Sequence, residues 1–123
     1  MSDYRQVEAA AGKGNGRARL ALEMFSDRVR ATIGAFTATL GGIDVLVFTG
    51  GIGEHTGSLR ARACAGLDCM GLRLDPKLNA SSQADADIAH KDSSARILMI
   101  HTREELLIAP EALRVSRSKK KKA

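Results

Sequence analysis

A short apolar run that ends in glycines constrains the fold of this chain more than any other feature. Residues 44–48 read Asp-Val-Leu-Val-Phe, and Thr-Gly-Gly-Ile-Gly-Glu follows at residues 49–54. Such a run, rich in β-branched side chains and without polar alternation, is typical of a strand buried on both faces in a parallel sheet. We therefore expect a buried strand, a tight glycine turn, and a helix that begins near Thr56 to Ser58 and ends near Ala65.

A long amphipathic helix and a second buried strand flank this unit. Apolar residues recur at spacings of three to five between Arg17 and Leu40, which predicts one helix with one apolar face. The residues of that face are Leu20, Met24, Phe25, Val29, Ile33, Phe36 and Leu40. Residues 96–100 read Arg-Ile-Leu-Met-Ile, in which four apolar residues follow the arginine, and predict the second strand. This order of elements indicates an α/β fold in which a long helix packs on a short, mostly buried sheet.

The remaining segments predict weaker elements. A short helical turn is expected over residues 7–11. Residues 72–74 alternate apolar with charged side chains, as a short edge strand does. Residues 75–94 are polar and predict mostly loop. A helix is expected over residues 103–109, where Pro110 should end or kink it.

Length and charge limit the function classes. The chain has 123 residues, which fits one domain or one half of a larger one. Most of its net charge of +5 comes from four lysines at 119–122, since without them fifteen cationic side chains face fourteen carboxylates. We interpret residues 1–115 as the folded portion and residues 116–123 as a basic disordered tail. With one tyrosine, three phenylalanines and no tryptophan, a base-stacking surface for nucleic acid is not expected.

Hydropathy and cysteine usage indicate the compartment. No apolar run is long enough to span a membrane, and the first residues show no signal-peptide pattern. Cys64 and Cys69 can form neither a disulfide framework nor a four-thiolate zinc site, and both are interpreted as small buried residues. We expect a cytoplasmic protein without a membrane partner.

The glycine turn is the strongest candidate for a ligand site. Glycines let the backbone approach a ligand closely, and the N–H groups at a helix start favour an anion such as a nucleotide phosphate. The segment lacks the Gly-Lys-Ser/Thr ending of a P-loop, and no glycine follows Gly53 at the spacing of a G-x-G-x-x-G turn. A strand-to-helix turn without a ligand is the alternative. His55, beside this turn, is the one histidine that we single out.

Two further segments carry candidate ligand residues. Thr-Arg-Glu-Glu at residues 102–105 follows the second strand, and carboxylates near a helix start can bind Mg²⁺ directly or through water. The alternative is a capping box, with Thr102 as the N-cap and Glu105 three residues later. Asp-Tyr-Arg at residues 3–5 offers an arginine that can reach a phosphate or stack on a base. The alternative for Arg5 is an ordinary surface arginine.

These three segments, in this order, resemble the C-terminal part of acetate kinases and of their propionate kinase relatives. The resemblance extends from about Ser2 to Ala109. The strand and glycine turn over residues 44–54 and the Thr-Arg-Glu-Glu-Leu segment at 102–106 are specific as a pair. The other residues that carry the resemblance are Ser2, Asp3, Tyr4, Arg5, Phe25, Ile33, Gly34, Ala35, Phe36, Arg60, Gly71, Leu72 and Asn79.

The resemblance implies a partial ribonuclease H-like domain of the actin-like ATPase group, in which ATP lies between two related α/β domains. Residues 1–115 would be its C-terminal nucleotide-binding portion. The implied nucleotide-contacting residues are Asp3, Tyr4, Arg5, Gly51, Ile52, Gly53, Glu54 and His55. The implied Mg²⁺ carboxylate is Glu104. The implied reaction transfers a phosphoryl group from ATP to a short-chain carboxylate, acetate or propionate, and gives an acyl phosphate and ADP.

The same resemblance implies that this chain holds none of the catalytic residues, which belong to the missing portion that includes the N-terminal domain. We therefore expect the chain to be inactive without that domain as a partner, and to share the homodimeric state usual in the family. His55 stands where the family usually has asparagine, and Pro110 stands where its last helix continues. A non-catalytic ATP- or ADP-binding module and a truncated gene product are the alternatives.

Overall fold

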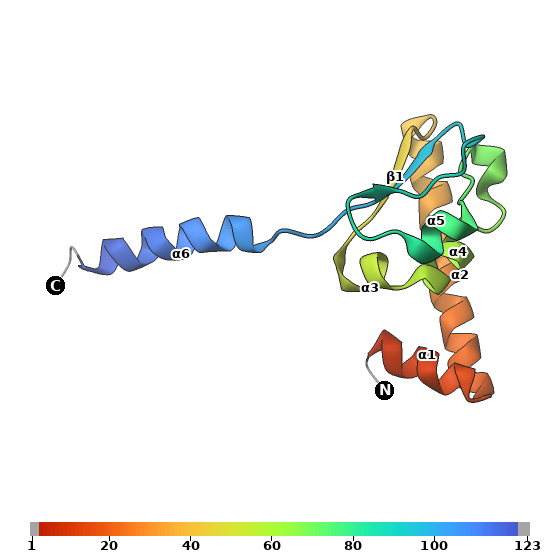
Figure 1. Ribbon diagram of the computed structural model, residues 1–123, viewed down its shortest axis with the longest axis horizontal. Coiled ribbons are helices and arrows are strands. Elements are labelled where there is room, and N and C mark those ends of the chain that lie inside the picture. Colours follow the sequence, from red (N-terminus) through yellow and green to blue (C-terminus); the bar gives the residue numbers. More distant parts are fainter. Residues whose placement is uncertain (1–2, 121–123) are drawn as a thin grey trace.

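The computed structural model describes residues 3–120 (Figure 1). In chain order its elements are α1 (Tyr4–Gly12), α2 (Gly16–Leu40), β1 (Val45–Phe48), α3 (Gly50–His55), α4 (Gly57–Cys64), the 3₁₀ helix η1 (Leu67–Met70), α5 (Pro76–Ser81), β2 (Ala86–Asp87), β3 (Arg96–Met99) and α6 (Glu105–Lys120). The expected α/β class is confirmed. In the part of the chain that the structure describes, no helix is both long and apolar enough to cross a bilayer.

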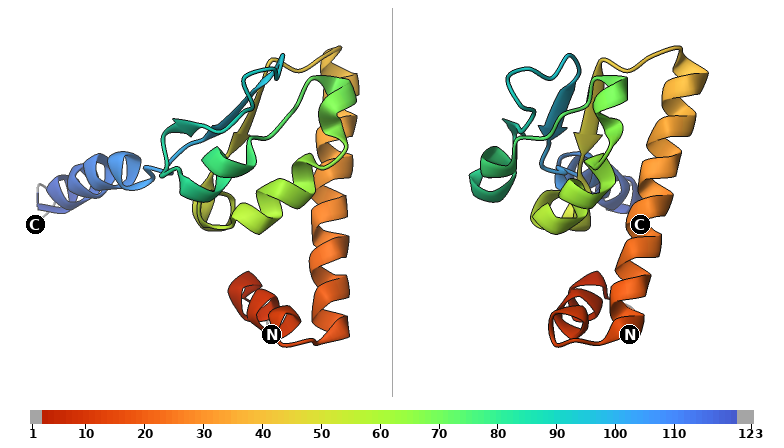
Figure 2. Two further views of the ribbon diagram at one scale, coloured as in Figure 1. Left: turned by 45° about the vertical axis from the view of Figure 1, so that its right-hand side comes forward. Right: turned by 90° about the vertical axis from the view of Figure 1, so that its right-hand side faces the viewer.

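The sheet has the strand order β1-β3-β2, with β1 parallel and β2 antiparallel to β3. The register pairs Leu46 with Ile97 and Phe48 with Met99, so these four side chains lie on one face. Residues of α2 and α4, including Ile33, join them in a single buried cluster. Figure 2 shows α2 running along this side of the sheet. The sheet and the two helices therefore form the two layers that position the site.

The prediction that β1 is buried on both faces is wrong. Val45 and Val47 point to the second face of the sheet and remain 46% and 48% exposed. No helix in residues 3–120 covers that face, because α6, which follows β3, extends away from the rest of the molecule (Figures 1 and 2). An apolar run is typical of a strand with a packed layer on each face of its sheet. Among the described residues, only one face of β1 is packed in this way.

The long helix α2 is confirmed to within one residue of the predicted start. The Asn15 side chain accepts a hydrogen bond from the Ala18 N–H at 3.1 Å and caps its start, and Gly41, with a φ of 75°, ends it. The predicted apolar face is only partly correct. The buried residues of α2 are Ala18, Leu22, Ser26 and Ile33, and of these only Ile33 was predicted. Of the predicted face, Leu20, Met24, Phe25, Phe36 and Leu40 are exposed. The small side chains within the buried set allow close approach of α1 and α4, which periodicity alone does not reveal.

Several local predictions need correction. The glycine segment forms the short helix α3 instead of the expected tight turn, and α1 is longer than the helical turn expected over residues 7–11. The segment over 72–74 makes only an isolated bridge, between Leu74 and Ala89, and the expected loop over 75–94 contains α5 and β2. The Asp75 side chain caps α5 by accepting hydrogen bonds from the backbone N–H groups of Lys77 and Leu78.

Pro110 does not end the last helix. It lies inside α6, which continues to Lys120. A proline removes one backbone hydrogen bond from the preceding turn, and α6 retains its helical form on both sides of that loss. Residues 116–120 of the predicted basic tail belong to α6, and its last residues, 121–123, lie outside the described residues.

The two faces of the sheet should respond differently to truncation. Ile97→Ala removes a side chain with no exposed surface and should lower the free energy of unfolding by about 2–5 kcal/mol. Val47→Ala, on the half-exposed face, is the control and should lower it by about 1 kcal/mol or less. Urea denaturation followed by circular dichroism measures both values. Equal losses would contradict one-sided burial of the sheet.

Candidate functional site

Two predicted segments that are distant in the sequence lie along one cavity. The cavity has a volume of about 530 Å³. Its lining residues are Asp3, Tyr4, Arg5, Glu8, Gly51, Ile52, His55 and Thr56. They come from the start of α1 and from α3 with the residue that follows it. The structure therefore brings the Asp-Tyr-Arg segment and the glycine segment together, while their contact with a nucleotide stays a prediction.

An adjoining cavity of about 250 Å³ gives this region an apolar wall. It shares Asp3, Tyr4 and Ile52 with the first cavity and is completed by residues of α1 and α2. The Tyr4 ring packs against Phe25 with ring centroids 5.6 Å apart and planes tilted by 59°. A cavity lined by both charged and apolar side chains, beside further aromatic and aliphatic surface, can accommodate a ligand that has a charged part and a flat ring.

Asp3 and Arg5 are partly committed to each other. The Asp3 carboxylate accepts a hydrogen bond from the Arg5 N–H at 3.0 Å, which caps α1, and it forms an ion pair with the Arg5 guanidinium at 3.1 Å. These bonds hold the pKa of Asp3 below its usual value. The Arg5 side chain is 85% exposed and presents its remaining donors to the solvent. Asp3 therefore acts as the N-cap of α1, and the Arg5 guanidinium remains accessible.

The three glycines of α3 have three different explanations. Gly50 has a φ of 73°, which disfavours other residues. A Cβ on Gly53 would lie 3.4 Å from the Phe48 backbone, so this glycine permits close packing of α3 on β1. A Cβ on Gly51 would meet no atom within 4 Å, although Gly51 lines the larger cavity. The missing side chain of Gly51 thus leaves open space where a ligand can approach the backbone.

Glu54 turns away from this cavity and toward the end of β3. Its residue surface is 6% exposed. One carboxylate oxygen lies 2.7 Å from Nδ1 of His101, and the other accepts hydrogen bonds from the N–H and the Oγ1 hydroxyl of Thr102 at 2.9 and 3.0 Å. The bond from His101 and then that from the Thr102 N–H lower the pKa of Glu54 to about 2, and Glu54 in turn raises the pKa of His101. Glu54 is therefore an ionised anchor that joins the two predicted site segments.

Thr102 caps α3 instead of the helix that follows it in the sequence. Its Oγ1 accepts a hydrogen bond from the Gly50 N–H at 2.8 Å and lies 2.9 Å from Oγ1 of Thr49. The expectation that Thr102 caps the helix after it is therefore wrong, because its hydroxyl is used 52 residues away in the sequence. A capping pattern specifies the chemistry of the cap, whereas the tertiary fold decides which helix receives it.

A second carboxylate, Asp85, holds the same segment from the other side. It accepts a hydrogen bond from the His101 N–H at 3.1 Å and forms an ion pair with Arg103. Neither His101 nor Asp85 is among the site residues predicted from the sequence. Asp85 adopts a φ of 66°, and no pattern in the sequence indicates that conformation or its partners.

Glu104, the expected Mg²⁺ carboxylate, is exposed. It stands two residues after Thr102, whose hydroxyl caps α3. Among residues 3–120, no group of three or more histidine, cysteine, aspartate or glutamate side chains is close enough to share a metal ion. Mg²⁺ commonly binds through one or two carboxylates together with substrate phosphates and water, so one exposed carboxylate at this place fits such an ion.

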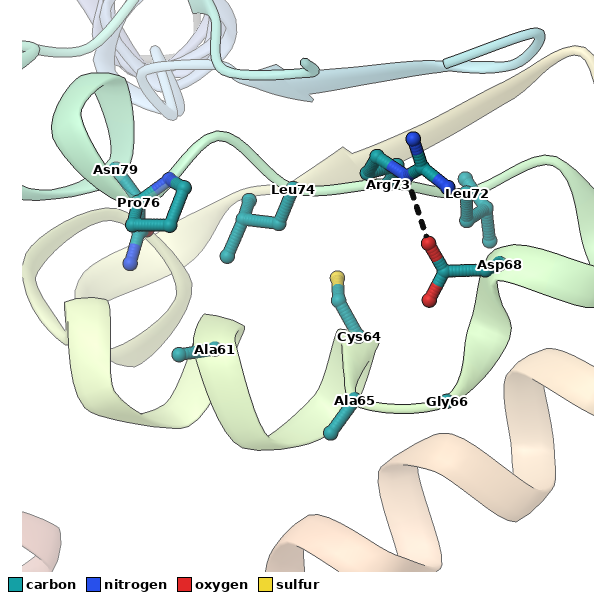
Figure 3. Close-up of a pocket in the computed structure, with 10 residues that line it drawn as sticks. All are labelled: Ala61, Cys64, Ala65, Gly66, Asp68, Leu72, Arg73, Leu74, Pro76 and Asn79. Atoms are coloured by element: carbon teal, nitrogen blue, oxygen red, sulfur yellow. Dashed lines mark hydrogen bonds and ion pairs between the residues drawn. The ribbon is translucent and has the colours of Figure 1, made fainter. Parts of the chain in front are cut away.

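Another cavity, of about 450 Å³, lies between α4 and residues 72–74 (Figure 3). The Cys64 sulfur points into it, and an ion pair between Asp68 and Arg73 lies at its edge. Burial raises the pKa of the Cys64 thiol to about 11, so the thiol is neutral and a poor nucleophile. Cys64 is thus the small buried residue that was expected, whereas Cys69 is exposed. None of the predicted ligand residues lines this cavity.

The pair of Glu54 and His101 predicts a pH window of maximal stabilisation. The pKa of Glu54 is lowered on folding, so its contribution is complete above its usual value of 4.5 and is lost as the pH falls toward about 2. The pKa of His101 is raised, so its contribution is complete below its usual value of 6.5 and is lost as the pH rises through the raised value. The difference in thermal midpoint between the wild type and Glu54→Gln should therefore be largest between pH 4.5 and 6.5.

The same variant provides a direct control. In Glu54→Gln the pKa of His101, followed by NMR through its ring protons, should fall toward the usual value for histidine. An unchanged pKa of His101 in the variant would show that the two groups do not interact.

Comparison with known proteins identifies the family. The model of the acetokinase family matches residues 1–110. The acetate kinase of Acaryochloris marina is 49% identical over 107 residues, which cover 87% of this chain and 27% of that protein. The crystal structure of the Porphyromonas gingivalis acetate kinase has a TM-score of 0.83 and 36% identity over 93% of this chain and 29% of that one. A propionate kinase from Francisella tularensis has a TM-score of 0.77 and 38% identity over 87% of this chain and 27% of that one.

The chain thus spans less than a third of the length of each of these relatives. The structural likeness confirms the partial actin-like ATPase fold that the resemblance implied. The family model covers nearly the whole chain, including the strand, the glycine segment and residues 102–106. The chain belongs to the acetokinase family.

Proposed function

We propose that this chain binds ATP or ADP with Mg²⁺ and is the C-terminal nucleotide-binding portion of an acetate or propionate kinase. One observation carries the proposal: residues 3–5 and the glycine segment, separated by more than 40 residues, line one cavity with open space at Gly51. The carboxylate of Glu54 joins the glycine segment to the segment that contains Glu104. A nucleotide site needs these parts together.

The lining residues suit different parts of a nucleotide. Tyr4 and Ile52 offer apolar surface to an adenine ring, and the accessible Arg5 guanidinium offers hydrogen-bond donors to a phosphate or ribose oxygen. The backbone of Gly51, with Gly53 supporting its packing, allows close approach. His55, at the end of α3, supplies a ring in place of the usual asparagine of the family.

We further propose that Asp3 and Glu54 contribute to nucleotide binding mainly by holding other groups. Asp3 fixes Arg5 and the start of α1, and Glu54 fixes α3 from its inner side. Glu104 would hold Mg²⁺, which neutralises the charge of the nucleotide phosphates when it is bound.

In the complete enzyme, we propose phosphoryl transfer from ATP to a short-chain carboxylate, which gives an acyl phosphate and ADP. This reaction depends on positioning and charge neutralisation on both sides of the nucleotide, and this chain supplies one side. We propose that it forms no acyl phosphate until the N-terminal domain is added, and that the complete enzyme is a cytoplasmic homodimer. A non-catalytic binding module would differ by staying inactive after that addition.

Filling the cavity at Gly51 should weaken nucleotide binding without unfolding the protein. Gly51→Leu places a side chain where no atom lies within 4 Å, so the thermal midpoint should not fall. Affinity for Mg-ADP, measured by isothermal titration calorimetry, should weaken by about tenfold or more, since a loss of about 1.4 kcal/mol has that effect. Gly12→Leu, at the end of α1, also meets open space and is the control with unchanged affinity. Unchanged affinity in Gly51→Leu would remove the nucleotide from this cavity.

The two adjacent carboxylates should differ in their effect on Mg²⁺. Glu104→Gln should weaken the Mg²⁺ dependence of nucleotide binding, because it removes the charge assigned to the ion. Glu105→Gln changes the same charge on the next residue and is the matched control. Calorimetric titrations at several Mg²⁺ concentrations compare them, and equal effects of the two variants would overturn the assignment of Glu104.

A further inference from the structure

A buried arginine lies directly behind the glycine segment. Arg60, in α4, is 3% exposed. Within residues 3–120, its guanidinium forms no ion pair with a carboxylate and donates hydrogen bonds to carbonyl and amide oxygens. Burial of an unpaired charge is unfavourable unless its donors are well satisfied. We therefore ask what the buried Arg60 guanidinium does behind α3.

The guanidinium binds the last turn of α3. Its Nη1 donates hydrogen bonds to the carbonyl oxygens of Gly53 and Glu54, both at 2.7 Å. These carbonyls belong to the last turn of a six-residue helix, where backbone acceptors lack helical partners and carry partial negative charge. His55 and Thr56, which line the proposed nucleotide cavity, follow directly. Arg60 therefore fixes the backbone from which the far end of the cavity is built.

Asn79 fixes Arg60 in turn. Nε and Nη2 of Arg60 donate to the side-chain and backbone oxygens of Asn79 at 2.7 and 3.0 Å. The Asn79 amide donates to the Gly57 carbonyl at 2.9 Å, so the first residue of α4 is held at the same point. A Cβ on Gly57 would lie 3.4 Å from the Asn79 amide nitrogen, which leaves the junction little room to adjust.

We propose that Arg60, oriented by Asn79, is a positioning residue of the nucleotide site. It sets the conformation of residues 50–56 through directed hydrogen bonds that the planar fork of an arginine provides and a lysine does not. This inference rests on the proposed function and adds to it a residue that touches no ligand. A purely structural role would stabilise α4 and α5 without changing the ligand-facing backbone.

The first experiment observes the backbone without ligand. In amide NMR spectra of the unliganded protein, Arg60→Lys should shift the resonances of Gly50, Gly51 and Gly53. Arg73→Lys is the matched control, because Arg73 is a half-exposed arginine paired with Asp68, and it should leave these glycines unchanged. Unmoved glycine resonances in a folded Arg60→Lys would overturn the proposal, even if its melting temperature falls.

The second experiment measures Mg-ADP binding to the full chain by calorimetry, at a temperature where each variant is folded. Arg60→Lys should weaken affinity about tenfold, an effect equal to about 1.4 kcal/mol. In Arg60→Ala, millimolar ethylguanidinium should restore affinity by occupying the vacated space. Unchanged affinity in Arg60→Lys would contradict the proposal, as would a failure of ethylguanidinium to restore binding to a folded Arg60→Ala.

Asn79→Ala replaces Arg60→Ala if the latter does not fold. It keeps the guanidinium but removes the orienting oxygen, and it should shift the same glycine resonances and weaken binding; no shift would contradict the proposal. A wild-type chain that binds no Mg-ADP would refute the proposed function instead, and the glycine resonances of the unliganded variants would still decide the role of Arg60.

Discussion

The carboxylate of Glu54 is the interaction on which the arrangement of the site depends. Because β1 and β3 are parallel neighbours, their carboxyl ends meet at one edge of the sheet. Glu54 comes shortly after the first of these ends, and His101 and Thr102 follow the second. A buried carboxylate needs several donors, and these two residues supply three hydrogen bonds. The chain segments that carry the glycines and Glu104 are therefore fixed to each other by one ionised group.

Much of this arrangement follows from patterns that local physics explains. Helical periodicity predicted α2, and apolar runs predicted β1 and β3, because those signals depend on neighbours in the sequence. The sequence did not predict that the Glu54 side chain points toward His101 and Thr102. The motif indicates a ligand site, but it does not show which residues of a short helix face the protein interior. Thr102 fits the pattern of a cap for the next helix, yet it caps α3. Contacts between residues about 50 positions apart depend on the tertiary fold, which cannot be predicted from the residue spacing within one segment.

The exposed apolar surfaces bear on the proposed role as one portion of a larger enzyme. Val45 and Val47 on β1, with Met24 and Phe36 on α2, have the hydrophobicity of core residues but are between 46% and 64% exposed. Such surface is unfavourable in a finished domain and typical of an interface. The relatives that match this chain are more than three times its length. Val45 and Val47, on the open face of β1, are therefore candidates for such an interface.

The helix α3 shows how the site can be both open and ordered. It has six residues and three glycines, so neither its length nor its composition would keep it helical in isolation. The N–H of Gly50, its first residue, donates a hydrogen bond to Thr102. The carboxylate of Glu54 pairs with His101, and the backbone carbonyls of Gly53 and Glu54 accept hydrogen bonds from Arg60. These anchors act on both ends and on the inner side, and they leave the outer side at Gly51 without side-chain cover. The glycines that would let a ligand reach the backbone are therefore tolerated because polar groups from two other segments, residues 101–102 and α4, hold that backbone in place.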